Sequence, residues 1–425
     1  MMKLHDTEEK VQRFLLVGVG TDKDETDIDA SLDELAELLR TAGGEECGRV
    51  TQNLESFNHR TYVGSGKVEE IKAALADTKA DGIICDDELT PAQLRNLGDE
   101  LNTKVIDRSL LILDIFSQRA STREGQMQVE LAQLEYRLTR LTGLGTELSR
   151  QGAAVGTHTR GAGETKLELD RRYIRSRIAQ LKADLKEVAE NRERERGSRR
   201  KSDIPVVALV GYTNAGKSTL FNRLTDSGVL EEDELFATLD TTVRRCELPD
   251  GRVTLLSDTV GFIHKLPAHL VKAFRSTLEE ANEADLLLHV VDASHPMADL
   301  HMKVTYEELV RLGAGNKPII TVLNKQDKVR EEQMFSIPYG AEAVIKTCAL
   351  DPKGREKLIQ AICDHFDALE KKLEILIPYT DASMTDRLHR EAVILEEEYT
   401  NEGVRMVIRG DEKIQRICSP YEIAK

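Results

Sequence analysis

The chain has 425 residues, of which 40% are hydrophobic and 32% are charged, as expected for a soluble protein of two or three domains. Its six cysteines form no CxxC pair, which argues against a disulfide framework or a zinc ribbon, and its apolar runs are too short to span a bilayer. The formal net charge is −16, but residues 118–201 hold 19 Lys and Arg against 12 Asp and Glu, so RNA binding is not excluded.

The N-terminus, MMKLHDTEEK, is polar and lacks the apolar core of a secretory signal. Widely spaced cysteines also favour a reducing compartment. We therefore expect a cytoplasmic protein with no stable membrane insertion.

Residues 1–117 alternate short apolar runs with helical patterns. The predicted strands are 14–20, 48–54, 81–87 and 103–108, and the predicted helices are 31–43, 67–80 and 90–101. This alternation predicts a parallel sheet with crossover helices, that is, an α/β domain. We expect Ser31 and Thr90 to cap their helices. The run from Val63 to Lys67 resembles part of a phosphate loop, but Thr61 stands where the first glycine should be, so we predict a plain turn into a helix.

Residues 118–201 are predicted to form a long antiparallel helical hairpin. Two segments, 122–148 and 165–195, carry apolar residues at alternating spacings of three and four, which is the pattern of two helices that pack along one seam. The connection between them is rich in glycine and basic residues, and residues 150–163 contain no acid. Such a backbone can fit closely against phosphates. We predict RNA contacts at Arg150, Gly152, Gly156, His158, Arg160, Gly161 and Gly163.

A buried strand at 205–210 leads into a glycine-containing loop and then a helix, in the pattern GxxxxGK[ST]. The loop residues are Gly211, Tyr212, Thr213, Asn214, Ala215, Gly216, Lys217, Ser218 and Thr219. Amides of such a loop surround phosphates, Lys217 can reach the β- and γ-phosphates, and the Ser218 hydroxyl can ligate Mg²⁺. This part of the sequence predicts a site for a nucleoside triphosphate with magnesium.

Two further segments fit the same site. Between the loop and the next strand lie Phe236, Ala237, Thr238, Leu239 and Asp240, followed by Thr241 and Thr242. A threonine here should ligate Mg²⁺ when the γ-phosphate is present, and the spacing does not choose among the three. A second strand ends in Asp258, Thr259, Val260 and Gly261. We expect Asp258 to hold Mg²⁺ through water and the Gly261 amide to sense the γ-phosphate.

A third strand ends in Asn324, Lys325, Gln326 and Asp327, the pattern NKxD. The Asp327 carboxylate can accept two hydrogen bonds from guanine, which adenine cannot donate. We expect Asn324 to support the loop, Lys325 to cover the base, and the segment Cys348, Ala349 and Leu350 to give a backbone amide to guanine O6. The predicted ligands are therefore GTP and GDP.

The remaining residues, 371–425, are predicted to form a small α+β domain after a nucleotide domain at 202–370. We expect a strand at 372–379, a helix at 386–399 and a strand at 404–410. The predicted fold class is therefore α/β: a P-loop domain with a parallel sheet and flanking helices, a small α/β domain and a helical hairpin before it, and a small α+β domain after it.

With these motifs, GYTNAGKST, FATLD, DTVGF and NKQD, and with the hairpin before them, the chain resembles the HflX family of ribosome-binding P-loop GTPases. The resemblance covers nearly the whole chain and implies that Thr238 is the second magnesium ligand. It also implies binding to the large ribosomal subunit, with the hairpin tip at ribosomal RNA near the peptidyl transferase centre. The chain departs from the family at Cys348, where Ser is usual. Phe262 follows DxxG, where Ras-like enzymes have a glutamine that orients water, so we expect slow intrinsic hydrolysis that the ribosome stimulates.

The implied function is a GTPase that dissociates stalled or idle ribosomes into subunits under stress and is reset by GTP hydrolysis. An alternative is a ribosome assembly or anti-association factor, which would bind RNA in its GTP state without splitting ribosomes. A third hypothesis is a signalling switch that recruits protein partners through the hairpin. We expect a monomer when the protein is free and no binding to DNA.

Overall fold

The computed structural model of the chain describes residues 11–21, 27–152, 162–200, 204–225, 235–236, 239, 241–267, 270, 280–330, 335, 340–369, 371–410 and 412–423. The chain divides into two compact units. One unit comprises Met1–Cys246 and Val253–Ala349, and the other comprises Glu247–Arg252 and Leu350–Lys425. Within the described residues, no helix is long and apolar enough to cross a bilayer.

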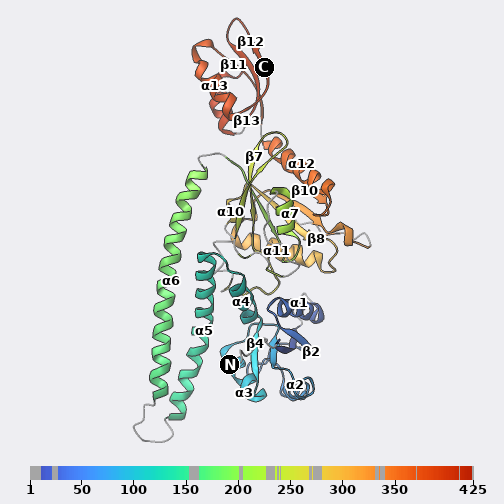
Figure 1. Cartoon of the computed structure of the whole chain (residues 1–425), viewed down its shortest axis with the longest axis vertical. Helices are drawn as coiled ribbons and strands as arrows, with labels where there is room; N and C mark the ends of the chain where they lie inside the picture. The colour runs from blue at the N-terminus through green and yellow to red at the C-terminus, as the bar shows by residue number, and fades with distance from the viewer. Residues whose placement is uncertain are drawn as a thin grey trace, which may run out of the picture. The chain divides into compact units, whose positions relative to one another are not determined.

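The first unit begins with a four-stranded parallel sheet, in the order β2-β1-β3-β4 (Figure 1). Its strands and helices are β1 (Arg13–Thr21), α1 (Ile28–Thr41), β2 (Glu45–Leu54), α2 (Ser65–Thr78), β3 (Gly82–Cys85), α3 (Pro91–Leu101), β4 (Lys104–Asp107) and α4 (Arg108–Arg119). The alternation of strands and helices predicted from the sequence is confirmed. We call this part, residues 11–119, the N-terminal part.

Two helix starts in the N-terminal part test the expected caps. Thr90 caps α3 in a reciprocal capping box with Gln93, as predicted. The expectation for Ser31 was wrong, because α1 begins three residues earlier and its N-cap is Asp27. Ser31 therefore lies inside the helix, and its buried hydroxyl donates a hydrogen bond to Asp86 Oδ2 at 2.7 Å. The turn at Val63 leads into α2, with Gly64 at the N-cap, as predicted.

The helical hairpin consists of α5 (Arg123–Gly152) and α6 (Ala162–Arg200), which pack side by side (Figure 1). The predicted seam is present: Leu131, Ile174, Ile178 and Leu181 are buried, and Met127, Leu134, Leu138, Leu141 and Leu185 pack against them. Ion pairs cross the seam, with Arg177 Nε 2.7 Å from Glu130 Oε1. Both helices are longer than predicted, since α6 continues through the charged residues up to Arg200.

A six-stranded sheet follows in the order β10-β9-β8-β5-β7-β6, and the strands from β10 to β7 are parallel. Its strands are β5 (Val206–Gly211), β6 (Thr242–Glu247), β7 (Val253–Asp258), β8 (Leu286–Asp292), β9 (Ile319–Asn324) and β10 (Ala341–Lys346). The described helices of this part are α7 (Lys217–Thr225), α10 (Glu280–Glu283) and α11 (Ala298–Leu312). Because β5, β8 and β9 are almost fully buried, the sheet is the core of this part.

The second unit contains α12 (Pro352–Leu369) and an antiparallel sheet in the order β11-β13-β12. Its strands and remaining helices are β11 (Lys371–Ile377), α13 (Ala382–Glu391), β12 (Val393–Tyr399), β13 (Val404–Gly410) and α14 (Glu412–Cys418). The helix predicted for 386–399 was therefore only half right. It ends at Glu391, and the β-branched pair Val393 and Ile394 begins a strand that pairs with β13.

Candidate functional site

The phosphate loop lies between the central strand β5 and α7, where the order of the six-stranded sheet reverses. In open α/β sheets, ligands bind at the carboxyl ends of the strands at such a point. Gly211 and Gly216 have φ values of 153° and 91°, which side chains with a Cβ rarely adopt. A Cβ on Gly216 would lie 2.4 Å from Asn324 Nδ2. Glycine is therefore needed at both positions by the backbone itself.

Lys217 is directed into the loop by main-chain oxygens. Its Nζ donates hydrogen bonds to Gly211 O at 3.2 Å and to Tyr212 O at 2.8 Å, and the residue is 6% exposed. Burial lowers its pKa to about 8, although the charge of Asp258 opposes this shift. A buried ammonium group gains most from an anionic partner, which suits a phosphate ligand.

Two oxygen ligands suited to Mg²⁺ meet beside this lysine. Ser218 Oγ donates a hydrogen bond to Asp258 Oδ2 at 2.8 Å, and Asp258 is fully buried at the end of β7. Hydroxyl and carboxylate oxygens are the ligand types that Mg²⁺ prefers, so this pair fits the metal. Thr238, the third predicted ligand, lies outside the described residues, as do Ala237 and Asp240. Their neighbours Phe236 and Leu239 are both 2% exposed.

The segment after β7 pairs with the start of the phosphate loop. Phe262 N donates to Gly211 O at 3.0 Å, and Thr213 N donates to Phe262 O at 2.7 Å. A Cβ on Gly261 would lie 2.8 Å from Lys217 Nζ, so there is no room for a side chain between Gly261 and the lysine. The Phe262 ring is 1% exposed and is packed in the core. Thr259 and Val260 are buried as well.

The NKxD segment is joined to the phosphate loop by side chains. Asn324 Nδ2 donates to Ala215 O at 2.9 Å, and its Oδ1 accepts from Ala349 N at 3.0 Å. Lys325 Nζ donates to Asn214 O at 2.8 Å. Asn324 thus connects the loop to the segment at Cys348 and Ala349, while Gln326 and Asp327 form a short 3-10 turn in which Asp327 is exposed.

One residue of this arrangement was missed by sequence reasoning. Asp292, at the end of β8, forms an ion pair with Lys325, with Oδ2 2.8 Å from Nζ. Burial raises the pKa of Asp292, but the hydrogen bonds from Lys325 and Ser294 and the charge of Lys325 together outweigh burial and hold this pKa below its usual value. A carboxylate that directly follows a buried strand of the parallel sheet was the signal that could have identified it.

Seven residues between positions 150 and 163 were predicted to contact RNA. Gly156, His158, Arg160 and Gly161 are outside the described residues. The backbones of Arg150, Gly152 and Gly163 belong to the ends of α5 and α6. Leu350, which was predicted to belong to the guanine-binding segment, is 66% exposed.

Three family models match the chain. They are described as GTP-binding GTPase N-terminal, over residues 29–117, GTP-binding GTPase Middle Region, over residues 119–199, and 50S ribosome-binding GTPase, over residues 206–325.

Curated relatives match over nearly the full chain. GTPase HflX of Lacrimispora saccharolytica is 49% identical and the match covers 95% of each chain. GTPase HflX of Caldanaerobacter subterraneus is 46% identical, with 92% of this chain and 90% of the relative covered. A solved GTP-binding protein of Sulfolobus solfataricus in complex with GDP is 25% identical, with a TM-score of 0.43 and coverage of 83% and 98%.

Proposed function

The chain belongs to the HflX family of GTPases, and we propose that in its GTP state it binds the large ribosomal subunit and separates stalled or idle ribosomes into subunits under stress. Hydrolysis of GTP to GDP and phosphate then resets the protein. We further infer that it acts in the cytoplasm and is a monomer when free.

The nucleotide site supports the first part of this proposal. Lys217 and the Gly261 amide would contact the γ-phosphate, and Asn324 would hold the phosphate loop against the base-binding segment that includes Asp327. Ser218, Thr238 and Asp258 would hold Mg²⁺, which would shield the phosphate charge. These residues bind and orient the nucleotide.

The rate of hydrolysis follows from Phe262. Its ring is 1% exposed and carries no hydrogen-bonding group, so it cannot orient an attacking water. Intrinsic hydrolysis is therefore slow, and we propose that the ribosome supplies or orders the missing group. A slow intrinsic rate keeps the GTP state intact until the protein has bound its target.

The observation that carries the ribosome proposal is the hairpin. Residues 118–201 have 19 basic and 12 acidic side chains in a chain whose net charge is −16, and α5 and α6 are stiffened by an apolar seam with ion pairs across it. A basic, elongated element in an acidic protein fits a polyanion such as ribosomal RNA. We propose that the tip, from Arg150 to Gly163, contacts RNA near the peptidyl transferase centre and competes with contacts that join the subunits.

Sedimentation of intact ribosomes tests the proposal. With the full chain and a non-hydrolysable GTP analogue, free subunits should increase, and with GDP they should not. Two variants serve as controls: Lys217→Ala should abolish the effect by weakening nucleotide binding, and Lys72→Gln, which breaks a surface ion pair on α2 outside the hairpin, should leave it intact. An unchanged subunit ratio would exclude splitting.

The same gradients separate the alternative function. A ribosome assembly or anti-association factor would bind isolated large subunits in its GTP state and would leave joined ribosomes unaffected. Deletion of residues 150–163 tests the role of the hairpin tip. If the protein is a signalling switch that does not use the tip to bind RNA, the deletion should leave its affinity for ribosomes unchanged.

A further inference from the structure

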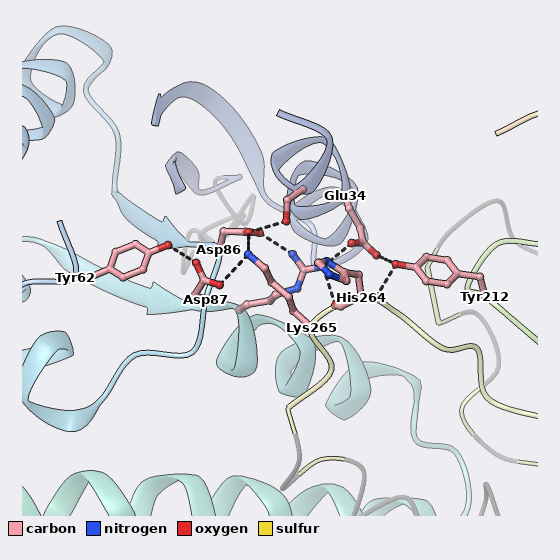
Figure 2. Close-up of polar contacts among 9 residues, drawn as sticks. Glu34, Tyr62, Asp86, Asp87, Tyr212, His264 and Lys265 are labelled. Atoms are coloured by element: carbon pink, nitrogen blue, oxygen red, sulfur yellow. Dashed lines mark hydrogen bonds and ion pairs between the residues drawn. The ribbon is translucent and has the colours of Figure 1, made fainter. Parts of the chain in front are cut away.

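A cluster of charged side chains, of which Asp86 and Arg108 are buried, lies where the N-terminal part meets the segment that follows Gly261 (Figure 2). The N-terminal part contributes three carboxylates and one guanidinium, from α1, the end of β3 and the start of α4: Glu34, Asp86, Asp87 and Arg108. The segment contributes Lys265, whose Nζ lies 2.6 Å from Asp86 Oδ2 and 2.8 Å from Asp87 Oδ1. We call these five residues the latch cluster.

Arg108 joins the carboxylates of the cluster. Its Nη1 lies 2.7 Å from Asp86 Oδ1, and its Nη2 lies 2.6 Å from Glu34 Oε2. Arg108 and Asp86 are each 1% exposed. Burial disfavours the ionised form of Asp86, but Arg108 and Lys265 outweigh burial and keep its pKa below the usual value. Asp86 therefore stays charged at neutral pH. Burial and the charge of Asp86 raise the pKa of Asp87, while Lys265 opposes this shift, so withdrawal of Lys265 would leave the half-buried Asp87 without its cation.

The backbone of the same segment is fixed as well. His264 N donates to Tyr212 OH at 2.6 Å, and His264 O accepts from Arg108 Nη2 at 3.1 Å. Tyr212, the second residue of the phosphate loop, in turn donates to Glu34 Oε1 at 2.5 Å (Figure 2). Lys265 itself has a φ of 54°, a left-handed conformation that lysine adopts where its surroundings hold it there.

Only three residues separate Lys265 from Gly261, and one of them, Phe262, is hydrogen-bonded to Gly211 and Thr213. Gly261 has no free space toward the phosphate loop, because an added Cβ would come within 2.8 Å of Lys217 Nζ and of Thr213 Cα. A shift of Lys265 would therefore move the segment that carries Gly261. The position of Gly261 beside Lys217 is set in part by the N-terminal part.

Phe236, in the segment expected to supply a magnesium-ligating threonine, also contacts the N-terminal part. The ring of Phe236 packs edge-on against Phe116 of α4, with centroids 4.7 Å apart and planes at 79°. Arg108 begins the same helix. Phe236 and the segment from Gly261 to Lys265, both expected to respond to the γ-phosphate, therefore both contact residues of α4.

We propose that Lys265 is a positioning residue for nucleotide discrimination: by pairing with Asp86 and Asp87 it holds Gly261 where the γ-phosphate is sensed, so that the N-terminal part favours GTP over GDP in the same chain. This inference rests on the proposed contact between Gly261 and the γ-phosphate. It does not depend on the ribosomal role. Because coupling is reciprocal, GTP would also strengthen the attachment of the segment to the N-terminal part.

The test compares the affinity of the full chain for GDP and for a non-hydrolysable GTP analogue, both with Mg²⁺, by titration calorimetry. Lys265→Met should weaken analogue binding about tenfold, within the usual range of coupling between sites, and leave GDP binding within about twofold. Lys265→Arg should restore most of the preference. Lys67→Met is the matched control, since Lys67 forms an ion pair with Glu70 within α2 and lies outside the cluster.

A second variant guards against misfolding, because Lys265→Met leaves Asp87 without its cation, while Asp86 keeps its ion pair with Arg108. The double variant Lys265→Met and Asp87→Asn removes that carboxylate charge, keeps the partner of the buried Arg108, and should show the same loss of preference for the analogue. The inference is overturned if the ratio of the two affinities is unchanged in both variants, or if both nucleotides are lost to the same extent, which would indicate a structural role only.

Gly261→Ala distinguishes an error in the role of Lys265 from an error in the role of Gly261. If this variant changes the ratio while Lys265→Met does not, the site assignment stands and the role of Lys265 is wrong. If Gly261→Ala binds both nucleotides as tightly as the unmodified chain does, the contact between Gly261 and the γ-phosphate is itself refuted.

Discussion

Asn324 offers a quantitative test of how the nucleotide site is held together. The residue is 1% exposed, and its amide joins two segments, donating to Ala215 O at 2.9 Å and accepting from Ala349 N at 3.0 Å. The substitution Asn324→Ala removes both hydrogen bonds and leaves a carbonyl and an amide without them. At about 1 kcal/mol for each bond, the loss is about 2 kcal/mol.

This loss converts into an expected affinity change. If it falls on the ordering of the two segments around the nucleotide, binding should weaken by up to about 30-fold, at 1.4 kcal/mol for each factor of ten. Neither bond lies at the γ-phosphate side of the loop. We therefore expect GDP and a non-hydrolysable GTP analogue to lose affinity equally.

Fluorescence titration with labelled GDP and labelled analogue measures both values. Asn282→Ala is a matched control, since Asn282 Nδ2 also ties a helix to a main-chain oxygen, Leu312 O at 2.6 Å, away from the phosphate loop. The reasoning is refuted if the folded Asn324→Ala protein binds GDP within about twofold of the unmodified chain, or if only the analogue loses affinity.

Three further predictions concern single residues. Gly216→Ala should weaken both nucleotides more than tenfold, because its Cβ would lie 2.4 Å from Asn324 Nδ2; titration with GDP checks this, and retained affinity would contradict it. Asp327→Asn should move the preference from guanosine to xanthosine nucleotides, which competition binding measures; unchanged preference would remove Asp327 from base recognition. Burial lowers the pKa of His301 to about 3, aided by His295. In the unfolded chain this histidine binds its proton at about pH 6.5, so the free energy of unfolding should fall as the pH drops from about 6.5 toward 3. His301→Phe should reduce the slope of this free energy against pH by up to one proton, about 1.4 kcal/mol per pH unit. Urea unfolding at pH 7, 6 and 5 measures the slope, and an equal slope in both proteins would contradict the prediction.

Local motifs made the nucleotide site predictable. The run from Gly211 to Thr219 specifies its own turn, since Gly211, which begins it, and Gly216, just before Lys217, have backbone φ values that favour glycine. The other motifs end strands β7 and β9, and the carboxyl ends of parallel strands share one edge of a sheet. The seam of the hairpin was predictable for a similar reason, because a repeat of three and four residues describes a single helix face.

Pairings between distant residues were not predictable in this way. Lys265 and Asp86 are 179 residues apart, and each alone has the signature of an ordinary surface charge. The same cluster explains the error at Ser31, whose hydroxyl serves Asp86 instead of a helix end. At 386–399, a strong helical pattern gave way after Glu391 to pairing with β13, a tertiary contact that outweighs local propensity. The domain boundaries and the RNA-contact residues stay predictions.

The length of α6 has a mechanical consequence. The helix runs for 39 residues, about 58 Å at 1.5 Å per residue, and only five residues of chain separate its end at Arg200 from the start of the central strand β5 at Val206. If it turns as a rigid rod, a rotation of about 5° at that junction sweeps its opposite end through about 5 Å, by the arc of a rod of that length. A displacement of that size exceeds the spacing between stacked nucleotides, which is about 3.4 Å.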